Sequence, residues 1–161
     1  MTTKLLKSPY PRGNGGDADA SQQFDLTERR VTVDWTFSML EKRYTTINRK
    51  QLPVGTLGLF VPSQGIEIVV DLFTFNYVGR SYPYSEYFDG IDFSAFGAYR
   101  LGVSRQHTAF IYENSQLLIV DKDSTNGTYL NRAVLEPYVP YQVKNNDAVQ
   151  LGGFEFVVKL D

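Results

Sequence analysis

The feature that most constrains the fold of this chain is a series of short apolar segments that begins after Pro53. Each segment is rich in β-branched or aromatic residues, which favour extended strands. Turn-forming residues separate the segments at 63–65, 113–115, 125–127 and 144–147, where a strand pair has to reverse. The segments are TLGLFV, IEIVVDLFTFNYV, HTAFIY, QLLIVD, TYL, YQV, AVQL and FEFVVKL. Many short strands without a long helical period predict an all-β fold, a sandwich or barrel of antiparallel strands.

The residues before Pro53 have a different character. Residues 1–20 are rich in Gly, Pro, Ser, Asn and Asp, a composition that predicts a disordered tail. Farther on, Trp35, Met39 and Leu40 fit a short helix, whereas the β-branched segment 31–33 favours a strand. The sequence does not decide between the two. We expect an N-terminal extension over residues 1–51 and one β domain over residues 52–161.

Charge and composition argue against several classes of function. The formal net charge of −2 lacks the basic surface that a dedicated nucleic-acid binder needs. The absence of cysteine excludes disulfides, thiol catalysis and cysteine-bound metals. The chain has no apolar run of about eighteen residues, and its first residues carry no apolar run of signal-peptide length. We therefore expect a cytoplasmic protein that makes no contact with membranes or nucleic acids.

The segment from Asp121 to Arg132 looks like a calcium-binding loop at first sight. Such a loop needs a glycine at its sixth place and a glutamate at its twelfth. Here Gly127 stands at the seventh place and Arg132 at the twelfth, so the pattern fails. We expect neither a metal site nor a cofactor.

The only histidine, His107, stands three places after Ser104, which raises the question of a catalytic pair. The two residues lie where a loop enters a strand, and successive strand residues point to opposite faces. Their side chains are therefore not expected to meet productively. A Ser–His hydrolase also needs a carboxylate that orients the histidine, and the sequence gives no sign of one. We expect no catalytic residue and no enzyme.

Three short polar stretches, at 79–80, 104–107 and 125–128, fall in loops between the predicted strands. Loops at one end of a sandwich converge in space. Together these loops supply guanidinium groups, hydroxyls and a carboxamide, which suits a dianion such as phosphothreonine, with its charge of about −1.5 to −2. Arg80 offers a planar fork to two phosphate oxygens, and the Ser104 hydroxyl offers a bond to a third. The carboxamide of Asn126 fits the main chain of an extended peptide.

Four motifs, taken together and in order, resemble the forkhead-associated (FHA) domain family. They are YVGR (77–80), VSRQH (103–107), DSTNGTYLN (123–131) and NNDAVQLG (145–152), and the resemblance covers roughly residues 52–161. It implies a β-sandwich of about eleven strands, mostly antiparallel, that binds phosphothreonine peptides through loops at one end. By this resemblance Arg80 and Ser104 contact the phosphate. Arg105 and Thr125 would assist them, and Asn126 would hold the main chain of the peptide.

Three further residues are expected to support the site without touching the ligand. Gly79 has a conformational role, and Gly127 occupies a turn position that favours a positive φ. The family resemblance gives His107 a structural role, in which its ring bonds across to steady the binding loop.

The stretch between Arg80 and Ser104 is longer than the connection that most FHA domains have there. Ile91–Phe93 resembles the short strand normally found in it. The tyrosine-rich segment SYPYSEYF (81–88) stands beside the predicted phosphate site. Its rings either shape or cover the pocket, or fold back on the end of the sandwich as a small separate core.

The sequence thus predicts a non-catalytic signalling adaptor that binds phosphothreonine-containing proteins, which implies a Ser/Thr kinase upstream. Thr2 and Thr3 carry leucines three places later, so a phosphorylated tail is a further candidate ligand for the same domain. The alternative is a scaffold of the same fold that makes phosphate-independent contacts. Such contacts would use the tyrosine-rich insertion or the N-terminal segment, and the chain could be one piece of a larger protein.

Overall fold

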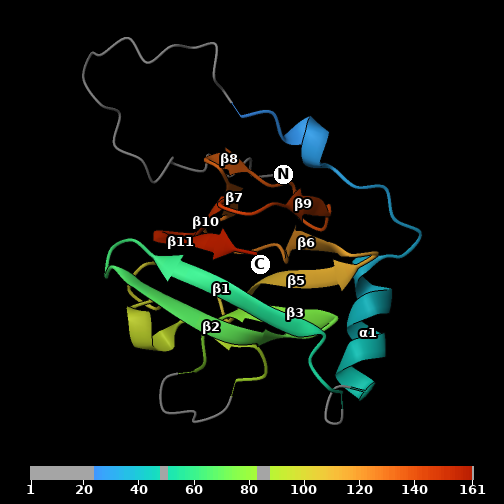
Figure 1. Ribbon diagram of the computed structural model, residues 1–161, viewed down its shortest axis with the longest axis horizontal. Coiled ribbons are helices and arrows are strands. Elements are labelled where there is room, and N and C mark those ends of the chain that lie inside the picture. Colours follow the sequence, from blue (N-terminus) through green and yellow to red (C-terminus); the bar gives the residue numbers. More distant parts are fainter. Residues whose placement is uncertain (1–23, 48–50, 83–87, 161) are drawn as a thin grey trace.

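The computed structural model describes residues 24–47, 51–82 and 88–160, so the predicted disordered tail lies outside the described residues. Within them, eleven strands form two sheets (Figure 1). The strands are β1 (Gly55–Val61), β2 (Ile66–Leu72), β3 (Phe75–Gly79), β4 (Ile91–Asp92), β5 (Gln106–Glu113), β6 (Gln116–Asp121), β7 (Thr128–Leu130), β8 (Ala133–Val134), β9 (Tyr141–Val143), β10 (Ala148–Leu151) and β11 (Phe154–Lys159). An α-helix, α1 (Phe37–Ile47), and two 3-10 helices, η2 (Leu26–Arg29) and η3 (Ser94–Phe96), accompany them.

The two sheets make a β-sandwich, which confirms the predicted fold class. One sheet has six strands in the order β2-β1-β11-β10-β7-β8, and the other has five in the order β4-β3-β5-β6-β9. The paired strands are antiparallel, except that β3 and β4 run parallel. Burial alternates along β1 and β11, so each of these strands turns one face to the core between the sheets.

The segment IEIVVDLFTFNYV, expected as one strand, forms two strands that belong to different sheets. β2 lies at the edge of the six-stranded sheet, and β3 lies inside the five-stranded sheet. The chain crosses between them without glycine or proline, because the buried Asn76 side chain closes the turn. Its Oδ1 accepts from the Phe73 N–H at 2.9 Å, and its Nδ2 donates to the Phe73 carbonyl at 2.7 Å. A side-chain turn of this kind carries no Gly or Pro signal in the sequence.

Part of the long insertion belongs to the main core. Phe93, which follows β4, is completely buried, and its ring centroid lies 4.6 Å from that of Phe154 and 5.1 Å from that of Phe156. Ala98 and Val103 of the same insertion are buried in the same cluster. The second half of the insertion is therefore anchored between the sheets, close to the strands that end at the predicted site.

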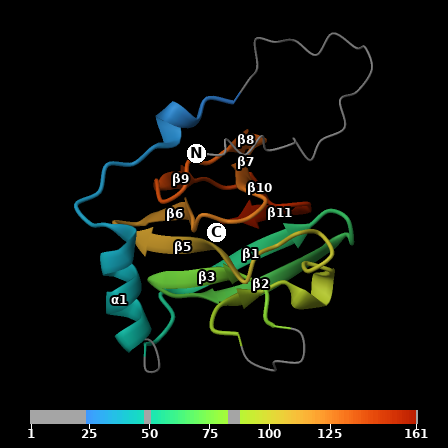
Figure 2. The same cartoon turned by 180° about the vertical axis from the view of Figure 1, so that it is seen from behind.

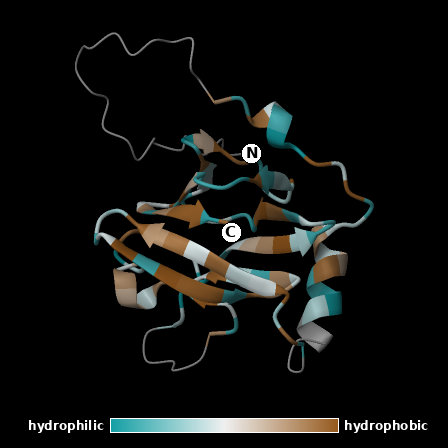
Figure 3. Ribbon diagram, viewed as in Figure 1, coloured by the Kyte–Doolittle hydropathy of each residue, from teal (hydrophilic) through white to brown (hydrophobic). Residues whose placement is uncertain are grey.

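The segment before β1 packs on the sandwich, and its helical interpretation is the correct one. Figure 1 and Figure 2 show α1 standing beside β3, β5 and β6, and Figure 3 shows that it carries both hydrophobic and hydrophilic residues. Phe37 and Leu40 are buried against the outer face of the five-stranded sheet. That face is formed by Phe75, Tyr77, Ala109, Ile111, Leu118 and Val120. The predicted boundary at residues 51 and 52 stays a prediction.

Residues 31–33 form no strand, although Arg30 makes a single β-bridge with Tyr141. The Val31 N–H also donates to the Pro140 carbonyl at 3.0 Å. The β-branched residues are therefore used in an extended segment along β9. No helix within the described ranges is long and apolar enough to cross a membrane.

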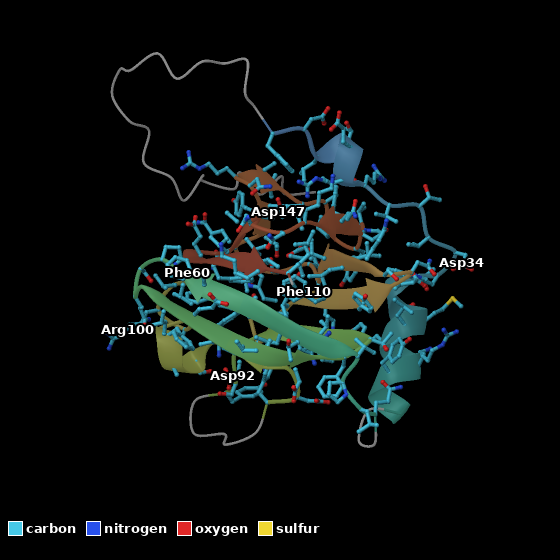
Figure 4. The ribbon with its side chains drawn as sticks, viewed as in Figure 1. Asp34, Phe60, Asp92, Arg100, Phe110 and Asp147 are labelled. Atoms are coloured by element: carbon cyan, nitrogen blue, oxygen red, sulfur yellow. The ribbon has the colours of Figure 1, made fainter. Side chains whose placement is uncertain are left out.

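The N-terminal segment also fastens one end of the sandwich through an arginine. Arg29 Nη1 lies 2.6 Å from Asp147 Oδ2, and Arg29 Nη2 lies 3.2 Å from Oδ1 (Asp147 is labelled in Figure 4). Asn131 Nδ2 and the Lys144 N–H donate to the same carboxylate at 2.8 and 2.6 Å. Burial by itself raises the pKa of Asp147, but these hydrogen bonds outweigh it and lower the pKa.

Candidate functional site

The three predicted loops lie at the same end of the sandwich. Arg80 follows the last residue of β3, and Gly79 pairs with Gln106 at the start of β5. Asp121, at the end of β6, pairs with Thr108 near the start of β5. The register therefore brings the loops at 79–80, 104–107 and 122–127 together. Asp147 lies at the other end, where Val143 pairs with Leu117 at the start of β6.

A pocket of about 490 Å³, here called the arginine pocket, opens between these loops. It is lined by Arg80, Ser81, Tyr82, Phe88, Ser104, Arg105, Gln106, Lys122, Asp123 and Ser124. The predicted ligand contacts Arg80, Ser104 and Arg105 all line it. Thr125 and Asn126 do not, and lie beside it: the Thr125 N–H donates to Ser104 Oγ at 3.2 Å, and Asn126 Nδ2 donates to the Gly102 carbonyl at 2.8 Å.

Arg80 is held by backbone carbonyls and an aromatic ring. Its Nε donates to the Val103 carbonyl at 2.6 Å, and its Nη1 donates to the Ser81 carbonyl at 3.2 Å. The guanidinium carbon lies 4.9 Å from the centroid of the Tyr99 ring. None of the ion pairs among the described residues includes Arg80. These contacts fix the orientation of the guanidinium and leave its positive charge for a ligand.

The insertion supplies a second stacked ring to the pocket. Tyr82 lies over the guanidinium of Arg105, with 3.9 Å from the guanidinium carbon to the ring centroid. Tyr82 and Phe88 both line the arginine pocket, whereas residues 83–87 lie outside the described residues. Tyr82, which is 59% exposed, is therefore a wall of the pocket, whereas Tyr99, which is 68% exposed, is not one of the residues that line it.

Gly79 allows two loops to approach each other closely. A β-carbon at this position would collide with the Arg105 carbonyl oxygen and would lie 2.6 Å from the Ser104 carbonyl oxygen. The Arg80 N–H donates to the same Arg105 carbonyl at 3.1 Å. The pairing of β3 with β5 is irregular here, since the register shifts between Val78 and Gly79. Glycine is therefore the residue that permits this junction.

His107 joins two loops of the site and makes no described contact with the Ser104 hydroxyl. Its ring is completely buried, Nδ1 accepts from the Ser104 N–H at 2.9 Å, and Nε2 lies 2.8 Å from the Gly127 carbonyl oxygen. Because Nδ1 accepts, Nε2 carries the hydrogen and donates to Gly127. Burial lowers the pKa of His107, against the opposing effects of the Gly127 carbonyl and Asp121. This geometry favours the structural role expected for His107.

Asp121 organises the loop after β6, a role that is not evident from the sequence. Asp121 is 2% exposed, and its Oδ1 accepts from the hydroxyls of Ser124 and Thr128, both at 2.6 Å. Its Oδ2 accepts from the Ser124 N–H at 3.2 Å. A carboxylate placed directly after the apolar strand LLIV was the available signal, because a buried carboxylate needs donors nearby.

Lys122 connects the arginine pocket to α1, which the sequence also did not reveal. Its Nζ lies 2.7 Å from Glu41 Oε2 and 2.5 Å from Gln106 Oε1. The same amine lies 5.0 Å from the centroid of the Tyr77 ring. Burial and the neighbouring Glu41 carboxylate raise the pKa of Tyr77, which keeps its hydroxyl protonated. A helix outside the predicted domain therefore contributes a charged group beside the site.

Residues 77–152 match the family model described as the FHA domain. The chain contains an FHA domain. The match includes the strands and loops that form the arginine pocket, from β3 to the end of β10. Arg80, Ser104, Arg105, Thr125 and Asn126 all fall inside the FHA match. α1 falls outside it, although the helix packs against Ala109 and Leu118 and pairs with Lys122, which lie inside the match.

Two curated relatives show how far the likeness extends. An 80-residue segment is 41% identical to the probable E3 ubiquitin-protein ligase dma1 of Schizosaccharomyces pombe, covering 47% of this chain and 29% of that protein. A 55-residue segment is 46% identical to the glycogen accumulation regulator GarA of Mycobacterium tuberculosis, covering 34% of this chain and 32% of that protein. The chain thus spans about a third of the length of these relatives.

Solved FHA structures share the fold. A chain from a structural and functional analysis of phosphothreonine-dependent FHA domain interactions superposes with a TM-score of 0.50 at 23% identity. The superposition covers 66% of this chain and 97% of that one. The FHA domain of an Arabidopsis thaliana hypothetical protein gives a TM-score of 0.53 at 22% identity, covering 69% and 91%. The region after Pro53 therefore has the FHA sandwich.

Proposed function

We propose that this chain is a non-catalytic module that binds phosphothreonine-containing proteins at the arginine pocket. The observation that carries this proposal is the state of Arg80: backbone carbonyls fix its guanidinium, and no described ion pair neutralises it. Arg105 and the Ser104 hydroxyl line the same pocket. The FHA match, and the work on phosphothreonine-dependent interactions of a similar FHA domain, support the choice of ligand.

The hydrogen bonds already made by Arg80 and Ser104 indicate how each would meet the phosphate. None of the described hydrogen bonds of Arg80 uses Nη2, so this group donates to the phosphate, and Nη1 has a second hydrogen besides the one donated to the Ser81 carbonyl. Ser104 Oγ accepts from the Thr125 N–H, which leaves the Ser104 hydroxyl hydrogen to donate to a phosphate oxygen. Arg105 lines the same pocket and adds a second positive charge.

Asn126 would hold the main chain of the bound peptide. One Nδ2 hydrogen is used on the Gly102 carbonyl, so the amide oxygen is available to accept a peptide N–H and the second Nδ2 hydrogen to donate to a peptide carbonyl. Thr125 assists by holding Ser104 in place. Hydrogen bonds to charged groups contribute about 1.5–3 kcal/mol each, so a few of them, less the cost of association, give micromolar affinity.

The partner is a protein phosphorylated on threonine, so a Ser/Thr kinase acts upstream. The chain's own Thr2 and Thr3 are a second source of the same ligand, and they lie outside the described residues. A module of this kind works as an adaptor that assembles proteins after phosphorylation, and the cytoplasm is the compartment in which we expect it.

The test is a titration of fluorescent peptides that carry threonine, phosphothreonine or phosphoserine, with degenerate flanking residues. We expect micromolar binding of the phosphothreonine pool alone. Arg80→Ala removes two or more charged hydrogen bonds and weakens this binding by about 50-fold or more. Arg100→Ala is the matched control, since Arg100 is exposed and does not line the pocket (Figure 4). Equal binding of the threonine and phosphothreonine pools, or full binding by Arg80→Ala, would favour the phosphate-independent scaffold.

A further inference from the structure

The arginine pocket is larger than its proposed ligand group requires. A phosphate has four oxygens around one phosphorus, so it fills only a small part of the pocket volume of about 490 Å³. Besides Arg80, Ser104 and Arg105, the pocket is lined by Ser81, Tyr82, Phe88, Gln106, Lys122, Asp123 and Ser124. Lys122 is thus a further cation in the same pocket, and the volume that a phosphate leaves can hold a neighbouring group of the ligand.

Lys122 lies between the arginine pocket and α1. It lines the arginine pocket, and it also lines a second hollow of about 350 Å³ that α1 forms with the sandwich. The Lys122 side chain is only 20% exposed, and its amine touches Gln106 on the pocket side and Glu41 on the helix side. The amine is therefore held in place at the boundary of the two hollows, within reach of a carboxylate in either.

Among the carboxylates near this end, Asp123 and Glu41 differ in what they contact. Asp123 lines the pocket and is exposed, whereas Glu41 belongs to α1 and is paired with Lys122 at 2.7 Å. A carboxylate from a bound peptide that approached Lys122 would have to share the amine with Glu41. An ammonium group has three hydrogens, and one of them is donated to Gln106 Oε1; Glu41 Oε2 lies 2.7 Å from the same nitrogen, so at least one hydrogen is left for a third acceptor.

We propose that Lys122 is a specificity-determining residue that selects phosphothreonine peptides with an aspartate or glutamate beside the phosphothreonine, and that Glu41 of α1 competes with that side chain. The inference rests on the proposed function and deepens it. A partly buried ion pair of this kind changes affinity by about three- to fivefold, which suits selection among ligands that all carry the phosphate. The helix, which the FHA match does not include, thereby takes part in ligand choice.

The experiment compares matched phosphothreonine peptides that differ only by aspartate or asparagine at one flanking position. The position is scanned over three places on each side, and fluorescence anisotropy gives each Kd. We expect the wild-type chain to favour aspartate at one or more positions by about three- to fivefold. Lys122→Gln abolishes this preference, because it weakens binding of the aspartate peptide more than binding of the asparagine peptide. Glu41→Gln removes the competing carboxylate and raises the preference by about threefold.

Two controls separate charge from folding. Lys122→Arg keeps a cation and retains a preference for aspartate, and thermal unfolding shows whether each variant is folded at the assay temperature. Lys144→Gln removes an exposed lysine at the other end of the sandwich, and we expect it to change neither the Kd values nor the preference for aspartate.

An unchanged preference in a folded Lys122→Gln variant would overturn the inference. So would equal weakening of both peptides, because Lys122 would then contact the phosphate. Failure of the wild-type chain to bind either peptide is a different result, since it refutes the proposed function itself and this inference with it.

Discussion

An arginine lies at each end of the sandwich, and the two differ in their partners. Arg29 meets the Asp147 carboxylate through both terminal nitrogens, and the two side chains are 13% and 7% exposed. Arg80 meets backbone carbonyls and the face of Tyr99. A carboxylate neutralises the charge that it orients, whereas carbonyls and a ring orient it without neutralising it. The first arrangement stabilises the fold, and the second leaves a fixed cation for the anion that we propose as its ligand.

We expect the largest effect on stability at the end of the sandwich where Arg29 meets Asp147. Arg29→Ala leaves the Asp147 carboxylate partly buried without its cation, so we expect the free energy of unfolding to fall by about 3 kcal/mol, measured in urea. The matched control is Arg30→Ala: Arg30 pairs with Glu136 at 3.7 Å, and both side chains are more than half exposed, so the loss stays below about 1 kcal/mol. The folded Arg29→Ala variant keeps its affinity for the phosphopeptide within about twofold. Equal losses in the two variants would contradict the distinction between the ends.

We expect a smaller effect on stability at the end with the arginine pocket, where Gly79 lets two loops meet. Gly79→Ala forces the Arg105 carbonyl away, so we expect a loss of about 2 kcal/mol in stability together with a phosphopeptide Kd weakened by about tenfold. Gly55→Ala is the control, because no atom lies within 4 Å of its β-carbon position. Its stability and its Kd should both match the wild type. If Gly79→Ala lowered stability with no change in Kd, the junction would support the fold alone.

The smallest effect concerns pH and His107. Burial lowers its pKa in the folded chain, so between that pKa and about 6.5 the unfolded chain binds a proton that the folded chain does not. Stability therefore rises with pH across this window and falls on acidification below about 6.5, by at most about 1.4 kcal/mol per pH unit. Urea titrations at pH 7.5 and 5.5 measure the change. His107→Gln lacks a titrating ring and should lose this slope, and since the chain has a single histidine, an unchanged slope would refute the assignment.

The fold was predictable where local residues determine it. HTAFIY and QLLIVD form β5 and β6, and TYL forms β7, because β-branched and aromatic residues between turns favour strands in any sandwich. The same reasoning fails at the turn between β2 and β3, because the Asn76 side chain takes the place of the usual glycine or proline there. The sequence does not decide whether α1 is a helix, because its apolar residues pack against β3, β5 and β6, which come later in the chain.

The site was predictable to a similar extent. Arg80, Ser104 and Arg105 stood out because loops at one end of a sandwich converge, and they do line one pocket. The pairs Glu41–Lys122 and Arg29–Asp147 did not stand out, as each joins residues that are far apart in the sequence and share no motif. The sequence presents Asp121 only as a possible metal ligand, whereas in the structure its carboxylate accepts from the hydroxyls of Ser124 and Thr128.

The docking of α1 has a consequence for how the chain is made. A ribosome releases the N-terminal residues first, at about 5–20 residues per second, so α1 leaves it well before β6 has been synthesised. Phe37 and Leu40 then stay in water for on the order of ten seconds before their docking surface exists. Arg29 stays without its ion-pair partner for longer still, because Asp147 lies 118 positions later. Co-translational folding of this chain is therefore complete only when β11, which joins β1 to β10, has emerged, and chaperones can act until then.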